Sequence, residues 1–168
     1  MEVTVYLGIG SNIEPRKEYI FRAMRILADN SRIRVGGRSS IYRTRPFGVS
    51  DQGEFLNLVL QVQTDLPPEE LFAVIKNAER QAGRIERQRW GAREVDIDIL
   101  LYGDQVYHSE VLDIPHKGLM SRDFFVVPLL ELMPDAENPE TGQKLSDLDF
   151  TGENRYVTGV YEPEEESV

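Results

Sequence analysis

The chain contains no cysteine, and this absence excludes several kinds of chemistry at once. Without thiols there is no disulfide, no thiolate nucleophile and no cysteine-ligated zinc. The chain also lacks an apolar run near the ~20 residues that a membrane-spanning helix needs. Its first residues, 1–6, show neither the basic part nor the apolar part of a secretory signal. We therefore expect a cytoplasmic protein that does not bind membranes.

Positive charge is also scarce. The 19 lysine and arginine residues face 29 aspartate and glutamate residues, which gives a formal net charge of −10. This balance disfavours general nucleic-acid binding, because contact with a phosphate backbone depends on lysine and arginine. Part of the negative charge lies in residues 161–168, which we expect to form a mobile acidic tail. The hydrophobic share of 40% is enough for a folded core, so we expect residues 1–160 to form one domain that acts as a monomer.

The positive charge that is present concentrates before a motif of alternating acids. Arginines occupy four positions of the segment 84–93, and Asp96-Ile97-Asp98 follows soon after. Because side chains alternate along a strand, Asp96 and Asp98 should stand side by side on one face. The same alternation predicts an apolar opposite face made of Val95, Ile97, Ile99 and Leu101.

This combination suits a phosphate-bearing ligand. Magnesium binds carboxylate and phosphate oxygens together, and guanidinium groups are bidentate partners of phosphate. A solvated strand edge beside an ordinary basic loop would have the same local sequence. From these two features alone, both interpretations stay open.

The rest of the chain alternates between strand-like and helix-like segments. Apolar spacing and turn residues predict two helices, over about 15–30 and 65–82, and four strands, over 3–7, within 32–44, over 55–64 and over 95–101. We interpret Gly8 to Asn12 as a tight turn after the first strand. A short strand after the turn at 102–106 and a last helix follow. This order is the β-α-β-β-α-β pattern of a ferredoxin-like α+β sandwich, with an appended strand and a C-terminal helix.

Apolar residues at helical spacing predict which helix faces are buried. In the first helix they are Ile20, Ala23, Met24 and Leu27, and in the second they are Leu71, Ile75, Ala78 and Ala82. Gly83 is suited to end the second helix. For the last helix we expect Ser121 as the cap, Pro128 as a restart or kink, and apolar contacts from Phe124, Val127, Leu130 and Met133.

Four blocks of sequence occur in an order that is typical of one enzyme family. They are the G-x-G-S-N run from Gly8 to Asn12; Thr44, Pro46 and Gly48 with Gln52, Phe55 and Asn57; the run from Arg89 to Leu100; and Pro115 and His116 with Met120, Arg122 and Phe124. Together they resemble the signature of the 6-hydroxymethyl-7,8-dihydropterin pyrophosphokinases of folate biosynthesis. The resemblance covers about residues 3–135.

The resemblance implies a reaction and two ligands. A pyrophosphoryl group would pass from ATP to the hydroxymethyl oxygen of 6-hydroxymethyl-7,8-dihydropterin, leaving AMP. Asp96 and Asp98 would hold two magnesium ions that bridge the phosphates. Arg84 and Arg93 would be the catalytic arginines, which neutralise charge on the transferred group and on the departing phosphate.

The resemblance also implies the contacts of each ligand. For ATP they are Glu79, Arg87, His116 and Arg122; for the pterin they are Thr44, Pro46, Phe47, Gly48, Phe55, Asn57, Trp90 and Phe124. Phe55 and Phe124 would face the flat heterocycle, and Asn57 would pair with its amide-like edge. Taken singly, Phe55, Phe124 and His116 would be read as ordinary core or surface residues.

Some positions depart from the family pattern, and some questions stay open. The departures are Arg45, Glu86, Ala92 and Lys117. They concern nucleotide affinity more than the type of reaction, because the aspartates and the paired arginines are kept. We expect the segments 44–53 and 84–93 to close over the ligands and exclude water. A regulatory domain that binds a metabolite without catalysis and a simple kinase that releases ADP are the two alternatives.

Overall fold

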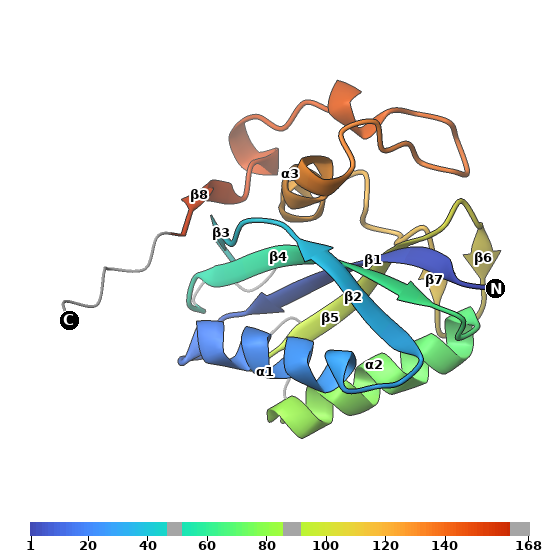
Figure 1. Cartoon of the computed structure of the whole chain (residues 1–168). Coiled ribbons are helices and arrows are strands. Elements are labelled where there is room, and N and C mark those ends of the chain that lie inside the picture. Colours follow the sequence, from blue (N-terminus) through green and yellow to red (C-terminus); the bar gives the residue numbers. More distant parts are fainter. Residues whose placement is uncertain (47–51, 86–91, 162–168) are drawn as a thin grey trace.

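The computed structural model describes residues 1–46, 52–85 and 92–161 (Figure 1). Its helices and strands are β1 (Val3–Ser11), α1 (Arg16–Ala28), β2 (Ile33–Arg38), β3 (Tyr42–Thr44), β4 (Phe55–Thr64), α2 (Pro68–Ala82), β5 (Asp96–Tyr102), β6 (Tyr107–His108), β7 (Asp113–Ile114), α3 (Asp123–Leu132) and β8 (Val157–Val160). Two short 3-10 helices, Leu145–Asp147 and Gly152–Asn154, precede β8. Of the predicted acidic tail only Tyr161 is described; the rest lies outside the described residues.

The main sheet is antiparallel and has the strand order β5-β1-β4-β3-β8. β2 and β3 pair with successive parts of β4, so that Ile33 lies opposite Thr64 and Tyr42 lies opposite Asn57. They therefore share the place of one strand beside β4. The order β5-β1-β4-β2/β3 is that of a ferredoxin-like sheet, and the predicted α+β fold is confirmed. β8 was not predicted, and the appended strand is a two-stranded hairpin of β6 and β7.

Helices cover both faces of the sheet. α1 and α2 lie side by side on one face, and α3 lies on the other (Figure 1). The predicted buried faces of α1 and α2 are confirmed, except that Met24 is only partly buried. Among the described residues, no helix is both long and apolar enough to cross a membrane.

The first correction concerns Gly8 to Asn12, which is not a turn after β1. β1 continues through Ser11, and Ile9 is buried in the core on the α1–α2 face. Gly8 and Gly10 are needed for space on the other face: a Cβ at Gly8 would lie 3.2 Å from the Phe125 ring, and one at Gly10 would collide with the Asn57 amide. The glycines therefore mark a strand whose surface must stay clear of side chains.

The second correction concerns the faces of β5. The β1–β5 register shifts so that Tyr6 lies opposite Leu101 while Leu7 lies opposite Ile99, and the extra residue forms a bulge. Ile97 and Ile99 pack on the α1–α2 side as predicted, but Leu101 packs on the α3 side. A bulge breaks the strict alternation on which the prediction depended.

The third correction concerns α3. Arg122, not Ser121, is the N-cap residue, and the Ser121 hydroxyl donates to the Gly118 carbonyl instead. Apart from Asp123, the buried residues are Phe125, Val126, Pro128 and Leu129. Of the predicted apolar contacts, Phe124 and Leu130 are partly buried and pack against this core, whereas Met133 is exposed. α3 is apolar on nearly every side, which is why spacing alone did not identify the face that meets the sheet.

Candidate active site

The paired aspartates lie where β1 leaves room for them. Asp96 lies opposite Gly10 and Asp98 lies opposite Gly8 in the antiparallel pairing of β5 with β1. Directly paired residues project to the same face of a sheet, and the two glycines have no side chains there. Both carboxylates are partly buried on the α3 side of the sheet. The predicted side-by-side arrangement of the two carboxylates is therefore what the strand pairing produces.

Both predicted catalytic arginines reach the same carboxylate. The guanidinium of Arg84 lies 3.0 Å from Asp96 Oδ1, and that of Arg93 lies 2.9 Å from the same oxygen. Arg84 follows Gly83, which ends α2 in a left-handed conformation with φ 116°. Glycine adopts this left-handed conformation at little energetic cost, and the turn directs the chain back toward β5.

Glu79 supports this centre from inside the protein. It is buried, and its carboxylate accepts the backbone N–H of Ile97 at 2.7 Å. It also lies 2.9 Å from Arg84 and 3.2 Å from Lys76. Glu79 therefore joins the end of α2 to β5 and holds Arg84 beside Asp96.

The three carboxyl groups differ in their protonation behaviour. Burial raises the pKa of Glu79, although Lys76 and Arg84 favour its charged form. Burial also raises the pKa of Asp96, and the charge of Asp98 adds to this rise. Burial opposes the ionisation of Asp98 as well, but the hydrogen bond from His116 and the nearby positive charges of Lys76 and Arg122 together outweigh it and lower the pKa to about 2. Of these three carboxyl groups, Asp98 is thus the one that most strongly favours its ionised form.

His116 has a defined tautomer in this arrangement. The backbone N–H of Gly118 donates to Nδ1 of His116 at 2.9 Å, so Nδ1 acts as the acceptor. The ring proton then lies on Nε2, which is 3.5 Å from Asp98 Oδ1. The ring also packs edge-on against Phe125, with 4.9 Å between the ring centroids. Neither ring nitrogen is available to accept a proton from a ligand.

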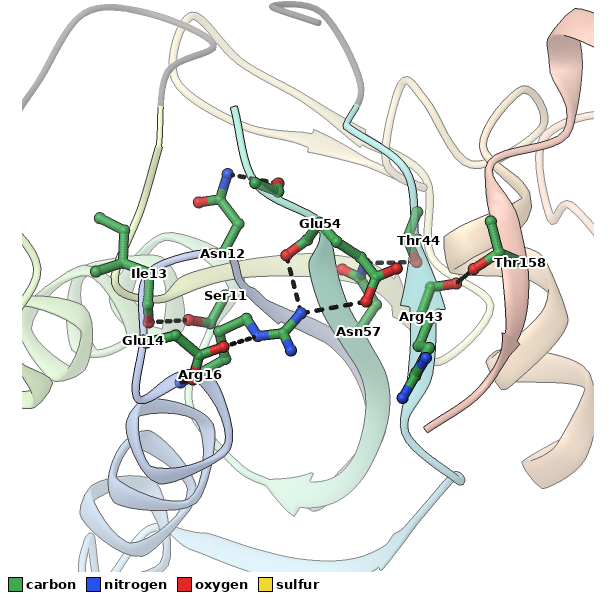
Figure 2. A network of polar contacts seen from close by, with 11 residues as sticks. Ser11, Asn12, Ile13, Glu14, Arg16, Arg43, Thr44, Glu54, Asn57 and Thr158 are labelled. Carbon is green, nitrogen blue, oxygen red and sulfur yellow. Dashed lines mark hydrogen bonds and ion pairs between the residues drawn. The ribbon is translucent and has the colours of Figure 1, made fainter. Parts of the chain in front are cut away.

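A first pocket opens over the glycine face of β1. It contains about 590 Å³ of empty space, including its open mouth, and is lined by Gly8, Gly10, Thr44, Arg45, Phe55, Asn57, Arg93, Asp96, Asp98, Arg122, Phe124 and Phe125. Asn57 donates to the Thr44 hydroxyl at 2.9 Å, which fixes an amide at the pocket wall (Figure 2). The pocket therefore combines aromatic rings, a fixed amide and the charged centre.

A second pocket lies on the other side of Asp98, and sequence reasoning missed most of it. Its lining is formed by Phe72, Ile97, Asp98, Ile99, Glu110, Val111, Leu112, Asp113, His116 and Lys117. Asp98 lines both pockets, so ligands bound in the two would approach one another at this carboxylate. The β6–β7 hairpin supplies Asp113, and the only sequence signal for this hairpin was a short strand expected after a turn.

Several predicted contacts fall elsewhere. Arg122, predicted for ATP, lines the first pocket, and Pro46 is not among the described residues that line it. Phe47, Gly48, Arg87 and Trp90 lie outside the described residues, as do most of the two segments expected to close over the ligands.

The chain after α3 supports the first pocket, which the sequence did not indicate. The guanidinium of Arg45 lies over the Tyr156 ring at 4.1 Å and donates to the carbonyls of Glu153 and Arg155 at 2.5 and 2.7 Å. The rings of Phe124 and Tyr156 meet edge to face. Buried Asp123 accepts the N–H groups of Tyr156 and Val157, each at 2.9 Å. Two pocket residues, Arg45 and Phe124, are therefore held by the C-terminal segment.

A ferredoxin-like sheet that carries paired carboxylates, two arginines and two adjoining pockets has the chemical groups that a phosphate-bearing ligand would need. The sequence model of the family described as 7,8-dihydro-6-hydroxymethylpterin-pyrophosphokinase (HPPK) matches residues 6–134. The chain therefore belongs to this family, which confirms the expected family and the expected enzyme class, a pyrophosphokinase that uses ATP.

Individual relatives agree with this assignment. The 2-amino-4-hydroxy-6-hydroxymethyldihydropteridine pyrophosphokinase of Aquifex aeolicus is 46% identical over 136 residues, which cover 81% of this chain and 84% of the relative. The folic acid synthesis protein fol1 of Schizosaccharomyces pombe is 43% identical over 142 residues, which cover 84% of this chain but 19% of that protein. A solved structure of HPPK-DHPS from Plasmodium falciparum with pteroate superposes with a TM-score of 0.70 at 15% identity. The match covers 88% of this chain and 42% of that longer chain, and it shows the fold alone.

Proposed function

We propose that this chain transfers the pyrophosphoryl group of ATP to 6-hydroxymethyl-7,8-dihydropterin. The pterin hydroxymethyl oxygen would release its proton to solvent and form a bond to the β-phosphorus of ATP. The bond between that phosphorus and the oxygen bridging to the α-phosphate would break, releasing AMP and the pterin diphosphate. The observation that carries the proposal is the meeting of two pockets at Asp98, next to Asp96, which pairs with both arginines.

The first pocket suits the pterin. Phe55 and Phe124 offer aromatic surface to a flat ring system, and both line the pocket. Asn57 is held by its bond to Thr44 and offers an amide for the paired donors and acceptors of the heterocycle. Phe47, Gly48, Pro46 and Trp90 remain predicted contacts from the family resemblance.

The second pocket suits the nucleoside end of ATP. It offers apolar surface from Phe72, Ile99 and Leu112, and its lining also includes Lys117 and His116, of which His116 contacts Asp98. A nucleotide there would extend its phosphates past Asp98 toward Arg84, Arg93 and Arg122. The arginines would neutralise charge on the transferred group and on the leaving phosphate. Arg87 belongs to the same proposal by resemblance.

Magnesium fits the donor set. Asp96 and Asp98 present hard carboxylate oxygens on one strand face, and Asp98 stays ionised because its pKa is about 2. Within the described ranges, no group of three or more His, Cys, Asp or Glu side chains could hold a metal ion. Phosphate oxygens and water would therefore complete the coordination of two magnesium ions. When bound, the metal would supply charge neutralisation and alignment of the phosphates.

The residues around this centre have positioning roles in the proposal. Glu79 would hold Arg84, since its carboxylate is buried and bonded to both Arg84 and the Ile97 N–H. His116 would orient Asp98 rather than act as a general base, because both of its ring nitrogens are engaged. The proposal also takes residues 1–160 as a single catalytic domain and the enzyme as a cytoplasmic monomer.

Phosphorus NMR of the purified protein with ATP, magnesium and 6-hydroxymethyl-7,8-dihydropterin tests the proposal. We expect the signals of AMP and of a pterin diphosphate to grow together. ADP with a pterin monophosphate would reject pyrophosphoryl transfer and favour a simple kinase. Binding of both ligands without turnover would favour a regulatory domain. Light scattering after size-exclusion chromatography tests the monomer.

A further inference from the structure

Asn12 connects two segments that carry residues of the site. It follows β1 directly and is 8% exposed, so its side chain is nearly buried. Its side-chain Nδ2 donates to Gln52 Oε1 at 2.9 Å and to the Gly53 carbonyl at 3.2 Å. One dashed line from Asn12 is drawn in Figure 2. The amide of Asn12 thus fixes the chain just before β4, where Phe55 enters the first pocket.

The opposite side of the same residue holds Arg93. Oδ1 of Asn12 accepts the backbone N–H of Arg93 at 2.7 Å, and the backbone N–H of Asn12 donates to the Arg93 carbonyl at 3.1 Å. Both backbone polar groups of Arg93 are therefore bound to one residue. Its guanidinium lies 2.9 Å from Asp96.

The segment before β4 has a second anchor that does not involve Arg93. Arg16, at the start of α1, donates to the Glu54 carbonyl at 3.1 Å and lies 3.3 Å from the Glu54 carboxylate (Figure 2). Arg16 therefore fixes only one of the two segments. Of Asn12 and Arg16, which both bond to the segment 52–54, Asn12 is the one that also bonds to Arg93.

We propose that Asn12 is a positioning residue that fixes Arg93 relative to the Phe55 wall of the first pocket. This inference rests on the proposed function, because it assigns the pterin to that pocket and the transferred group to Arg93. Asn12 would act through both segments without touching either ligand. An amide side chain can accept from the Arg93 N–H through its oxygen and donate to the Gly53 carbonyl through its nitrogen at the same time; a carboxylate only accepts, and an aliphatic side chain does neither.

The test uses Asn12→Leu, Asn12→Asp and a matched control, Gln63→Leu. Gln63 also bridges β4 to β1 through its side-chain amide, donating to the Thr4 hydroxyl at 2.7 Å, but it lies at the far end of both strands. Steady-state kcat and the KM of each substrate are measured per folded protein, with folding checked by circular dichroism and thermal unfolding.

We expect the two Asn12 variants to separate the effect of the hydrogen bond from the Arg93 N–H from the effect of the hydrogen bond to the Gly53 carbonyl. Asn12→Leu loses both of these side-chain hydrogen bonds. Its kcat should fall about 10- to 100-fold and its pterin KM should rise, because small displacements of groups that position a substrate are costly. Asn12→Asp keeps the acceptor for Arg93 and loses the donor to Gly53. Its pterin KM should rise while kcat stays closer to that of the parent. Gln63→Leu should match the parent in kcat and both KM values.

Several results would overturn the inference. Asn12 variants with the kcat and pterin KM of Gln63→Leu would show that Arg93 and Phe55 are positioned without Asn12. Losses that only follow the unfolded fraction, with both KM values unchanged, would show a purely structural role. If Asn12→Leu does not fold, the Asn12→Asp split between kcat and pterin KM decides. A parent that produces no pterin diphosphate would overturn the proposed function itself, and the positioning role with it.

Discussion

At the scale of single residues, the charged groups at the centre of the site are held by one another. Asp96 receives Arg84 and Arg93 on the same oxygen, and Arg84 also reaches buried Glu79. Such pairing lets partly buried charges persist, because an unpaired charge there would be costly. Phosphates bound at this centre would compete with Asp96 for the same guanidinium groups. Substitution of one arginine is therefore the most direct test of the proposed chemistry.

Arg93→Ala should lower kcat by about 10²- to 10³-fold, the usual loss when one preorganised charge-stabilising group is removed. The unfolding temperature should change little, because Asp96 keeps its contact with Arg84. Steady-state kinetics and thermal unfolding measure the two effects. Arg34→Ala is the control, since Arg34 pairs with Glu2 in an exposed contact and neither residue lines a pocket of the site. An unchanged kcat in Arg93→Ala would remove this arginine from the mechanism.

Gly118→Ala should weaken ATP binding with little loss of stability. A Cβ at Gly118 would lie 2.6 Å from Nε of Arg122, so the flexible arginine side chain would have to move rather than the backbone. The expected result is a raised KM for ATP at a nearly unchanged unfolding temperature. Gly159→Ala is the control, because nothing lies within 4 Å of its added Cβ. Equal ATP KM values in the two variants would contradict a role of Arg122 in ATP binding.

At the scale of elements, hydrogen bonds of acidic side chains connect both ends of α3 to neighbouring segments. Near its start, Asp123 accepts two backbone N–H groups of the segment leading into β8. Near its end, Glu131 accepts the Tyr42 hydroxyl at 2.5 Å and the Ser40 N–H at 2.6 Å, which joins α3 to the beginning of β3. These polar ties determine how α3 lies on the sheet, and with it the placement of Phe124.

The Glu131 contact should make stability depend on acid pH. Partial burial opposes ionisation of Glu131, but the hydrogen bonds from Tyr42 and Ser40 outweigh it and hold its pKa below the usual 4.5. A carboxyl whose pKa is lower in the folded state stabilises the fold above its unfolded pKa. That contribution is lost as pH falls below 4.5 through the folded pKa.

Glu131→Gln should therefore have a lower unfolding temperature than the parent at neutral pH and a shallower decline on acidification. Thermal unfolding from pH 7 down to about pH 3 measures both. Glu137→Gln, which removes an exposed carboxylate elsewhere, controls for the change in net charge. Parallel curves for the parent and Glu131→Gln would rule out the contribution of this contact.

At the scale of the whole molecule, ligand binding should stabilise the fold through the site between β5 and α3. A ligand at 100 times its Kd adds about 2.7 kcal/mol to the free energy of unfolding. A non-hydrolysable ATP analogue with magnesium should therefore raise the unfolding temperature of the parent, and EDTA should reverse the rise. Asp98→Asn should show a smaller rise. A shift that EDTA leaves intact would contradict metal-assisted nucleotide binding.

Local sequence was enough to predict much of this protein. The buried faces of α1 and α2 and the glycine end of α2 follow from spacing and from backbone preferences, which act over a few residues. The order of these elements allowed the ferredoxin-like fold to be predicted, because few chain paths join such a series without crossing connections. The Asp96–Asp98 pair was predictable for the same reason, since it needs only the period of a strand.

Tertiary structure decided what depends on distant partners. The role of Gly8 and Gly10 depends on Phe125 and Asn57 across the sheet, and the placement of Leu101 depends on a bulge that forms only when β5 pairs with β1. The buried face of α3 was set by the surface it meets, because the helix itself is apolar nearly all round. Tyr156 contacts both Arg45 and Phe124, although these residues lie far from it in the chain. Asn12 likewise bonds to the distant Arg93. The sequence by itself determined elements, fold and family, whereas the shape of the site was decided by contacts that no local pattern encodes.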